Sequence, residues 1–328
     1  MRLELDIVAT RGEMIESRHR VHAAVVDGSG ALIASAGDPG ISTVLRSCAK
    51  PFQVVPFLES GGFDELEWSD EMLALAVASH GGEPEHVAIV ERMLGSLELE
   101  EGDLACGPHD PLSRRGQKLL KESGEPATRL HNNCSGKHSA MLAFAQVSDW
   151  PTRGYEACVH PVQQKVAECL ATWTDLPASQ LRLLVDGCGV VAFGLPMQAF
   201  ALALARFAAA AHRGDAIPAR VLGAMAAHPF LVGGTDRFDT VLIEETQGRV
   251  IAKIGAEGVH AVAVPERGFA AIVKVEDGAF RAQHPAVLRL LQYLDVLPAE
   301  LPPRLQAILR TPIVNTRGAT VGEIRPVA

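Results

Sequence analysis

The chain has 328 residues, of which 48% are hydrophobic and 21% are charged. These proportions are typical of globular proteins, so we expect one large domain or two closely packed ones, without extended disorder. The formal net charge is -9, and the sequence contains no block of Lys and Arg. This charge argues against nucleic acid, and against an anionic membrane surface, as a main partner.

The N-terminal residues, MRLELDIVATRGE, lack the basic start and apolar run of a signal peptide. The most apolar segment, 190–211, is interrupted by Pro196, Gln198 and Arg206, which favours a buried helix over a membrane span. We therefore expect a cytoplasmic protein. Disulfides are rare in the cytosol, so the six cysteines are expected to be thiols or metal ligands.

The N-terminal part has the pattern of β structure. Segments 3–8, 20–26 and 31–35 are predicted strands, and the Gly-rich sequence DGSG at 27–30 indicates a hairpin between the last two. A helix is expected to begin near Ser47. Further helices are predicted at about 69–79, 84–97, 114–123, 136–147, 158–173 and 196–213.

From about residue 240 the pattern returns to β structure. The segments TVLIEE (240–245), RVIAKIG (249–255), VHAVAV (259–264) and FAAIVKV (269–275) are predicted strands, followed by a helix at about 284–294 and a turn-rich remainder. The N-terminal hairpin should pair with this C-terminal meander in one antiparallel sheet. Segregated strands and helices predict an α+β fold. We expect a single unit, 1–328, with a sheet part at about 1–45 and 238–328 and a helical part at about 46–237.

The first group of residues suited to chemistry is RSCAK at 46–50. The Ser-x-x-Lys spacing at the start of a helix places Ser47 and Lys50 on one face, and Pro51 is compatible only with the first turn. A lysine activates a serine only if it is neutral, so its pKa must fall from about 10.4 to roughly 7–8 through burial and a second cation. The alternative reading is a helix-capping serine beside a solvent-exposed lysine.

Two further motifs supply partners for this pair. ASHGGE at 78–83 places Ser79 at a predicted helix end, and its alternative reading is an ordinary helix terminus and turn. AKIGAEG at 252–258 places Lys253 on a late strand. Serine acyl enzymes of the β-lactamase group combine an early Ser-x-x-Lys with a late Lys-Thr-Gly. Ile254 replaces the Thr here, so Ser79 is the candidate for the missing hydroxyl.

The segments HNNCSGKH (131–138) and DGCG (186–189) concentrate polar residues beside cysteines. Thiolates bind zinc well, and spacing alone nominates Cys134, His138 and Cys188 as ligands. Two buried thiols beside a helix cap, or a disulfide between the two cysteines, are the alternatives at this point.

Taken in order, these motifs resemble the asparaginase family typified by the inducible rhizobial enzyme. The resemblance covers almost the whole chain and includes the blocks VATRG (8–12), RSCAKPFQ (46–53), ASHGGE (78–83), HNNCSGKHSAML (131–142), DGCGV (186–190), RFDT (237–240) and AKIGAEGV (252–259). It implies a serine β-lactamase/glutaminase-like fold and a homodimer. It also implies a catalytic group formed by Ser47 with Lys50 and Ser79 with Lys253.

The resemblance further implies a zinc ion held by Cys134, Lys137 and Cys188, so that Lys137 replaces the His138 suggested by spacing. A lysine ligand must be neutral, and metal binding would keep it so. Substrate contacts are then expected from Arg46, His80, Asn133, His138, Asp186 and Glu257.

The expected function is hydrolysis of the side-chain amide of L-asparagine to L-aspartate and ammonia. In this hypothesis Lys50 takes the proton of Ser47, which then carries the acyl group, and Ser79 relays a proton or completes the charge network. The alternatives are a glutaminase, a β-lactam-type acylase, or a zinc-binding protein without catalysis.

Overall fold

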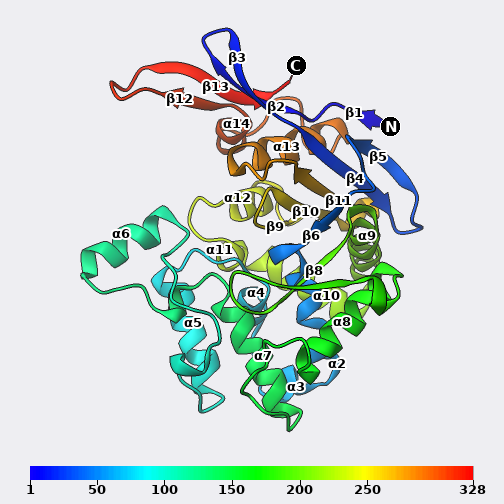
Figure 1. Ribbon diagram of the computed structural model, residues 1–328, viewed down its shortest axis with the longest axis vertical. Coiled ribbons are helices and arrows are strands. Elements are labelled where there is room, and N and C mark those ends of the chain that lie inside the picture. The colour runs from blue at the N-terminus through cyan, green and yellow to red at the C-terminus, as the bar shows by residue number, and fades with distance from the viewer. Residues whose placement is uncertain (328) are drawn as a thin grey trace.

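The computed structural model describes residues 1–327 and has an α+β architecture (Figure 1). Its largest sheet is built from both ends of the chain, in the spatial order β1 (Arg2–Leu3), β5 (Leu32–Ala36), β4 (Val21–Asp27), β11 (Phe269–Val275), β10 (Val259–Val264) and β9 (Ile251–Ile254). The predicted hairpin around residues 27–30 is β4–β5, and β4 pairs antiparallel with β11 of the meander, as predicted. Only the short β1–β5 pair among these strands is parallel.

The prediction of one sheet was incomplete, because two smaller sheets are also present. The first contains β12 (Thr311–Val314), β13 (Thr320–Pro326), β2 (Ile7–Arg11) and β3 (Met14–His19), and the second contains β6 (Ser42–Val44), β8 (Val191–Pro196) and β7 (Arg182–Val185). Strand β8 occupies the start of the apolar segment 190–211, which was predicted as one helix. Pro196 ends that strand, and the helix begins at the next residue.

Most helices are formed by the part of the sequence that lies between the N-terminal and the C-terminal strands of the large sheet. They are α1 (Lys50–Gln53), α2 (Val55–Glu59), α3 (Gly62–Glu65), α4 (Asp70–Ala76), α5 (Pro84–Gly95), α6 (Arg114–Ser123), α7 (Ser135–Val147), α8 (Pro161–Thr174), α9 (Met197–Arg213), α10 (Ala216–Ala227), α11 (Pro229–Val232), α12 (Phe238–Glu245), α13 (Phe280–Tyr293) and α14 (Pro303–Leu309). The predicted strand at 240–245 was wrong, because this segment is the interior of α12. Its β-branched residues are buried on the helix, so tertiary packing overrides their strand propensity.

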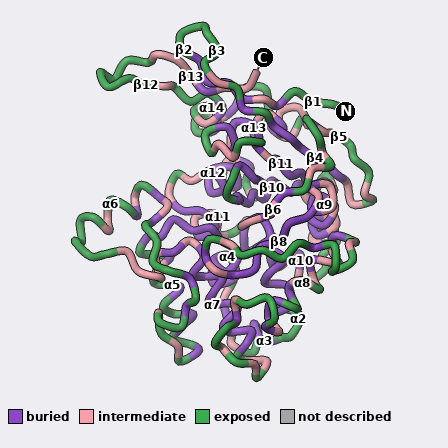
Figure 2. The backbone as a smooth tube through the Cα atoms, in the orientation of Figure 1, coloured by how far each residue is buried: buried purple, intermediate pink, exposed green. Residues whose placement is uncertain are grey.

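The core lies on both sides of the large sheet. Helix α9 packs on β4 and β11, and α13 packs on β10 and β11. Every residue of β10 is buried, as expected for a strand covered on both faces. Figure 2 shows buried backbone running through these strands and through α4, α7 and α9, whereas β3, β12 and α6 lie at the periphery.

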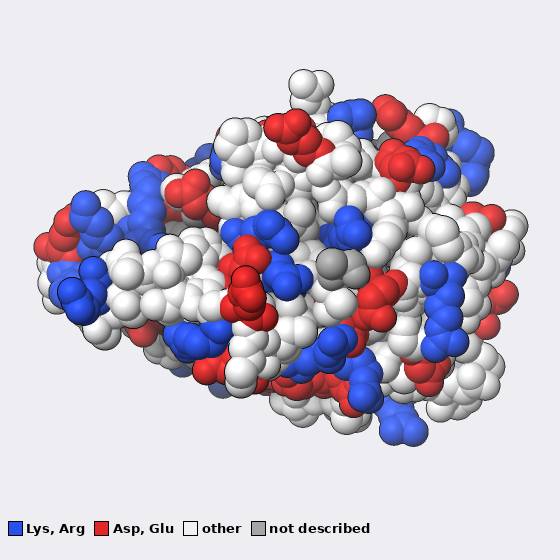
Figure 3. Space-filling model, turned by 90° about the horizontal axis from the view of Figure 1, so that it is seen from above, with Lys and Arg blue, Asp and Glu red and all other residues white. Residues whose placement is uncertain are grey.

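The described surface combines mixed charge with exposed apolar side chains on β7, namely Leu183, Leu184 and Val185. Figure 3 shows acidic and basic side chains interspersed on one face, without a large area of either sign among the residues drawn in colour. No helix within residues 1–327 has the length and apolar character needed to cross a bilayer. The homodimer expected from the resemblance stays a prediction.

Candidate active site

Two buried lysines meet at one serine where the sheet part adjoins the helical part. Lys50 begins α1, Ser79 follows α4, and Lys253 lies on β9. The Ser79 Oγ atom is 2.8 Å from Lys253 Nζ and 3.3 Å from Lys50 Nζ. Lys50 is 1% exposed and Lys253 is 3% exposed. The fold therefore brings the three side chains together from distant parts of the sequence.

The two amines have different surroundings. Lys50 Nζ donates to Ser79 Oγ and to the carbonyl oxygens of Ala78 and Asn133, so three acceptors match the three N–H bonds of an ammonium group. Lys253 Nζ has two partners, Ser79 Oγ and the Ile254 carbonyl at 3.0 Å. Burial, reinforced by the positive charge of Lys50, lowers the pKa of Lys253 to about 7. Burial and a neighbouring cation, the two effects that a neutral amine was expected to require, thus act on Lys253.

Ser47 is half-buried and lies in a 3₁₀ turn, η1 (Arg46–Ala49), that leads directly into α1. The expected hydrogen bond between Ser47 and Lys50 is not formed, because the lysine side chain turns inward to the buried carbonyl groups near Ser79. Arg46 has a φ of 50°, which is unusual for a non-glycine residue, and its Nε lies 2.7 Å from Asp186 Oδ1. This ion pair holds a strained backbone immediately before Ser47.

Both serines line a cleft of about 670 Å³, a size suited to a small molecule. Three of the predicted substrate contacts, Arg46, Asn133 and Asp186, also line it. The cleft is therefore lined by the partly exposed hydroxyl of Ser47, by Ser79 with its two lysine contacts, and by charged side chains of both signs. Such a site is suited to nucleophilic attack on a small polar substrate.

Two thiols and an amine converge beside this cleft, and both thiols line it. Cys134 precedes α7, Lys137 lies in its first turn, and Cys188 lies in the turn between β7 and β8. Lys137 Nζ is 3.0 Å from Cys188 Sγ, and a hydrogen bond from Cys188 lowers the pKa of Cys134. Residues 1–327 contain no cluster of three or more His, Cys, Asp or Glu side chains able to hold a metal. A metal ion here would therefore need the Lys137 amine as its third protein ligand.

Comparison with protein families decides the relationship of the chain. A family model described as L-asparaginase II matches residues 7–326, nearly the whole sequence. The chain belongs to the L-asparaginase II family. Among solved structures, the chain is similar to a crystal structure of a β-lactamase from Mycobacterium bovis, with a TM-score of 0.41 and 16% sequence identity. The match covers 85% of the present chain and 96% of the β-lactamase chain. No curated protein sequence matches the chain.

The other three predicted substrate contacts do not line the cleft. His80 is fully buried, and its Nε2 is 2.9 Å from Ser135 Oγ. His138 is also fully buried, with Nδ1 2.6 Å from the Tyr155 hydroxyl. Glu257 is exposed in the turn between β9 and β10. The two histidines thus contact side-chain hydroxyl groups within the core, and motif density alone did not distinguish this role from ligand contact.

Sequence reasoning assigned no role to Asp239, which positions the strand of Lys253. Asp239 Oδ2 accepts the Ile254 N–H at 2.8 Å, and Oδ1 is 2.9 Å from His260 Nε2. Its negative charge acts to raise the pKa of Lys253, against the effects of burial and Lys50. The sequence singled out Asp239 only as part of the RFDT segment, one of the blocks that resemble the family.

Proposed function

We propose that the protein is an L-asparaginase that hydrolyses the side-chain amide of L-asparagine to L-aspartate and ammonia. The observation that carries this proposal is the Ser79 hydroxyl held between two buried lysines at the wall of a cleft, in a member of the L-asparaginase II family. A neutral amine hydrogen-bonded to a serine hydroxyl can act through that hydroxyl as the general base for a nucleophile in the same cleft.

The contacts support one distribution of protons. Lys50, with three acceptors, is the cation and donates to Ser79 Oγ. Lys253, with its lowered pKa, is assigned as the neutral amine, and its nitrogen lies 2.8 Å from Ser79 Oγ, close enough for its lone pair to take the Ser79 proton. Ser79 can therefore receive a proton on its oxygen while it passes its own proton to Lys253. This assigns the general base to Lys253 and the proton relay to Ser79.

We assign the nucleophile to Ser47. Ser79 is 3% exposed and engages two lysines, whereas Ser47 is half-buried, lines the cleft and follows the strained Arg46. A strained backbone at a nucleophile is a recognised way of presenting its oxygen to a substrate. Both serines line the cleft, and the mechanism requires Ser47 Oγ to come within hydrogen-bond reach of Ser79 Oγ when the substrate binds.

The reaction then follows in two halves. Ser47 Oγ forms a bond to the amide carbon while its proton moves to Ser79 and the Ser79 proton moves to Lys253. The oxyanion that forms on the amide oxygen needs a hydrogen-bond donor, and each good donor contributes roughly 3–4 kcal/mol. Lys253 returns its proton to the leaving nitrogen, the C–N bond breaks and ammonia departs. Water attacks the acyl-enzyme by the same relay and releases aspartate.

The direct test is a coupled assay of ammonia release from asparagine and glutamine. We expect turnover of asparagine, with kcat/KM at least about 10-fold higher than for glutamine, because one methylene displaces the amide within the cleft. A higher value for glutamine would reassign the protein to a glutaminase, and equal values would contradict the predicted selectivity. Absence of ammonia from both amides would reject the proposal.

We also propose that Cys134, Lys137 and Cys188 hold a zinc ion. The donor set fits, because all three side chains are buried and converge, and thiolates are preferred zinc ligands. A zinc ion held beside the cleft would help to orient the substrate. The neighbouring thiols raise the pKa of Lys137 although burial opposes this, so metal binding must displace a proton from its amine.

Replacement of Lys137 by methionine should weaken zinc binding by about 100-fold, because it removes the amine of one of the three ligands. Loss of a residue that only hydrogen-bonds a metal ligand already costs up to about 100-fold in metal affinity, so loss of a ligand should cost at least as much. Competition with a chromophoric chelator measures the affinity, and binding to the wild type should tighten as pH rises. Lys121→Met, at an exposed position, is the control. A Lys137→Met variant that binds zinc as tightly as the wild type would contradict the ligand set.

A further inference from the structure

Arg237 is a cation in the cleft that lacks a carboxylate partner. It lines the cleft immediately before α12, and its Nη1 donates to the Leu112 carbonyl at 3.2 Å. Its Nε is buried without a hydrogen-bond partner among residues 1–327, and no carboxylate oxygen of these residues lies within 4.0 Å. The guanidinium group therefore retains donors for a ligand.

The second arginine of the cleft provides a comparison. Arg46 is neutralised by Asp186 at 2.7 Å, whereas Arg237 is not neutralised by any described side chain in contact with it. Burial lowers the pKa of Arg237, and the charges of Asp239 and Glu83 offset this only in part. A carboxylate from the substrate would supply the missing negative charge, and the planar guanidinium group is suited to binding it with two hydrogen bonds.

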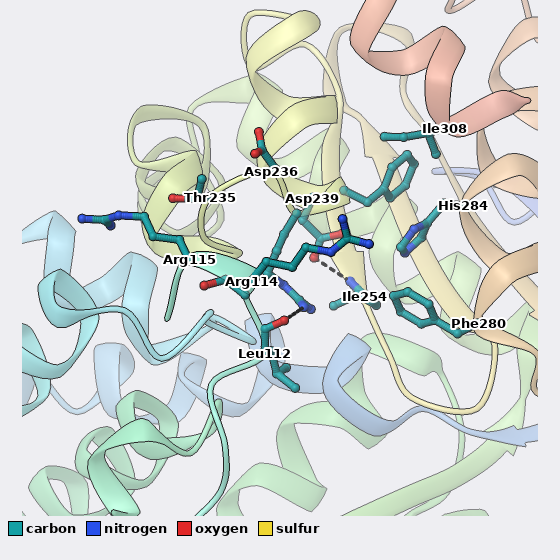
Figure 4. A pocket seen from close by; sticks show the side chains of 13 residues that line it. Leu112, Arg114, Arg115, Thr235, Asp236, Asp239, Ile254, Phe280, His284 and Ile308 are labelled. Carbon is teal, nitrogen blue, oxygen red and sulfur yellow. Dashed lines mark hydrogen bonds between the residues drawn. The ribbon is translucent and has the colours of Figure 1, made fainter. Parts of the chain in front are cut away.

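Arg237 also lies where the cleft adjoins a second hollow of about 380 Å³. Leu112, Ile254 and Phe280 contribute to both cavities. Figure 4 shows that Arg114 extends into the second hollow toward His284 and Phe280, whereas Arg115 points away from it. The guanidinium group of Arg237, which pairs with no carboxylate of residues 1–327, favours an anionic group of the ligand at this boundary over a neutral one.

The position of Arg237 relative to the base is fixed by the fold. Asp239, two residues later in the first turn of α12, accepts the N–H of Ile254, the residue after Lys253. The backbone that carries the guanidinium group is thereby tied to the strand that carries the base. A carboxylate held at Arg237 would place the reacting amide at a set distance from the catalytic group.

We propose that Arg237 binds the α-carboxylate of the substrate and restricts the enzyme to amides that carry a free carboxylate. This inference rests on the proposed amidohydrolase function and names its substrate class. It predicts that asparagine is recognised through both ends of the molecule. Peptide-bound or decarboxylated amides, which lack this charge, are then poor substrates.

The test compares asparagine with β-alaninamide, which is asparagine without its α-carboxylate. The wild type should prefer asparagine by about 100-fold in kcat/KM, the size expected for a charged hydrogen-bonded pair. Arg237→Gln should lower kcat/KM for asparagine by about 100-fold, mainly through KM, and leave β-alaninamide unchanged. Arg237→Lys should lose about 10-fold, because it keeps the charge without the two parallel hydrogen bonds. Arg153→Gln, at an exposed position that lines neither cavity, is the control and should behave as the wild type.

Equal losses on both substrates, or no loss on asparagine, would overturn the role of Arg237. If Arg237→Gln fails to fold, as judged by thermal unfolding, Arg237→Lys decides: an unchanged preference for asparagine over β-alaninamide would overturn the proposal. Calorimetric binding of L-aspartate and of β-alanine, which is aspartate without its α-carboxylate, tests the carboxylate site separately from the proposed amide hydrolysis. If the wild type hydrolyses no amide, the proposed function fails. Loss of aspartate binding in Arg237→Gln, with β-alanine binding unchanged, would then still support the carboxylate site. Unchanged aspartate binding in Arg237→Gln would overturn the carboxylate site.

Discussion

Replacement of Lys253 by methionine should reduce kcat/KM for asparagine by about 10³-fold, the contribution of a well-placed general base. Methionine preserves most of the buried length of the side chain but removes the amine that lies 2.8 Å from Ser79 Oγ. The loss should therefore appear in turnover while the folded structure persists. Steady-state ammonia release, together with a thermal unfolding scan, measures both quantities.

The wild-type pH profile provides an independent measurement of the same group. Lys253 must be neutral to act as the base, and its pKa is lowered to about 7. As pH falls below about 7 the neutral fraction falls, so kcat/KM should decrease about tenfold per pH unit, with a plateau above this value. Asp239→Asn should move this limb to lower pH, because the carboxylate acts to raise the pKa of Lys253.

Lys274→Met is the matched control for Lys253→Met. Lys274 lies on β11 of the same sheet and is partly buried, and burial also lowers its pKa, but its amine contacts the carbonyl oxygens of Glu257 and Val275. This variant should keep the wild-type turnover and pH profile. Full activity in Lys253→Met, or a pH profile that is flat between 5 and 8, would exclude Lys253 as the base.

Replacement of Ser47 by alanine should reduce turnover of asparagine by about 10⁴-fold or more, because the covalent route is lost. Acid quenching during turnover, followed by peptide mass spectrometry, should find the acyl group on Ser47 in the wild-type protein. Ser79→Ala should retain some acylation of Ser47 but at a rate lowered by about 10²-fold, since only the proton relay is removed.

An exposed serine supplies the control for this series. Ser29→Ala, in the β4–β5 hairpin turn, should have wild-type kinetics. An acyl group found on Ser79 would transfer the nucleophile to that residue, and wild-type turnover in Ser47→Ala would rule out the assignment of Ser47.

The fold was predicted best where local signals agree with tertiary packing. The start of α5 follows from Pro84 in its first turn, and the β4–β5 hairpin follows from the Gly-rich sequence at 27–30. Prediction failed at 240–245, where β-branched residues form the buried interior of α12. Strand β8 was also missed, because an apolar strand followed directly by an apolar helix shows no change in composition.

The sequence by itself identified the family and the motifs that carry Ser47, Lys50, Ser79 and Lys253, because short segments with fixed spacing are local properties of the chain. Only the tertiary structure decided that Lys253 has the lowered pKa, that Ser79 lies between the two amines, and that His80 and His138 are buried away from the cleft. It also decided that Arg237 has no carboxylate partner within residues 1–327. Desolvation and charge pairing depend on which distant residues surround a group, and spacing along a sequence does not contain that information.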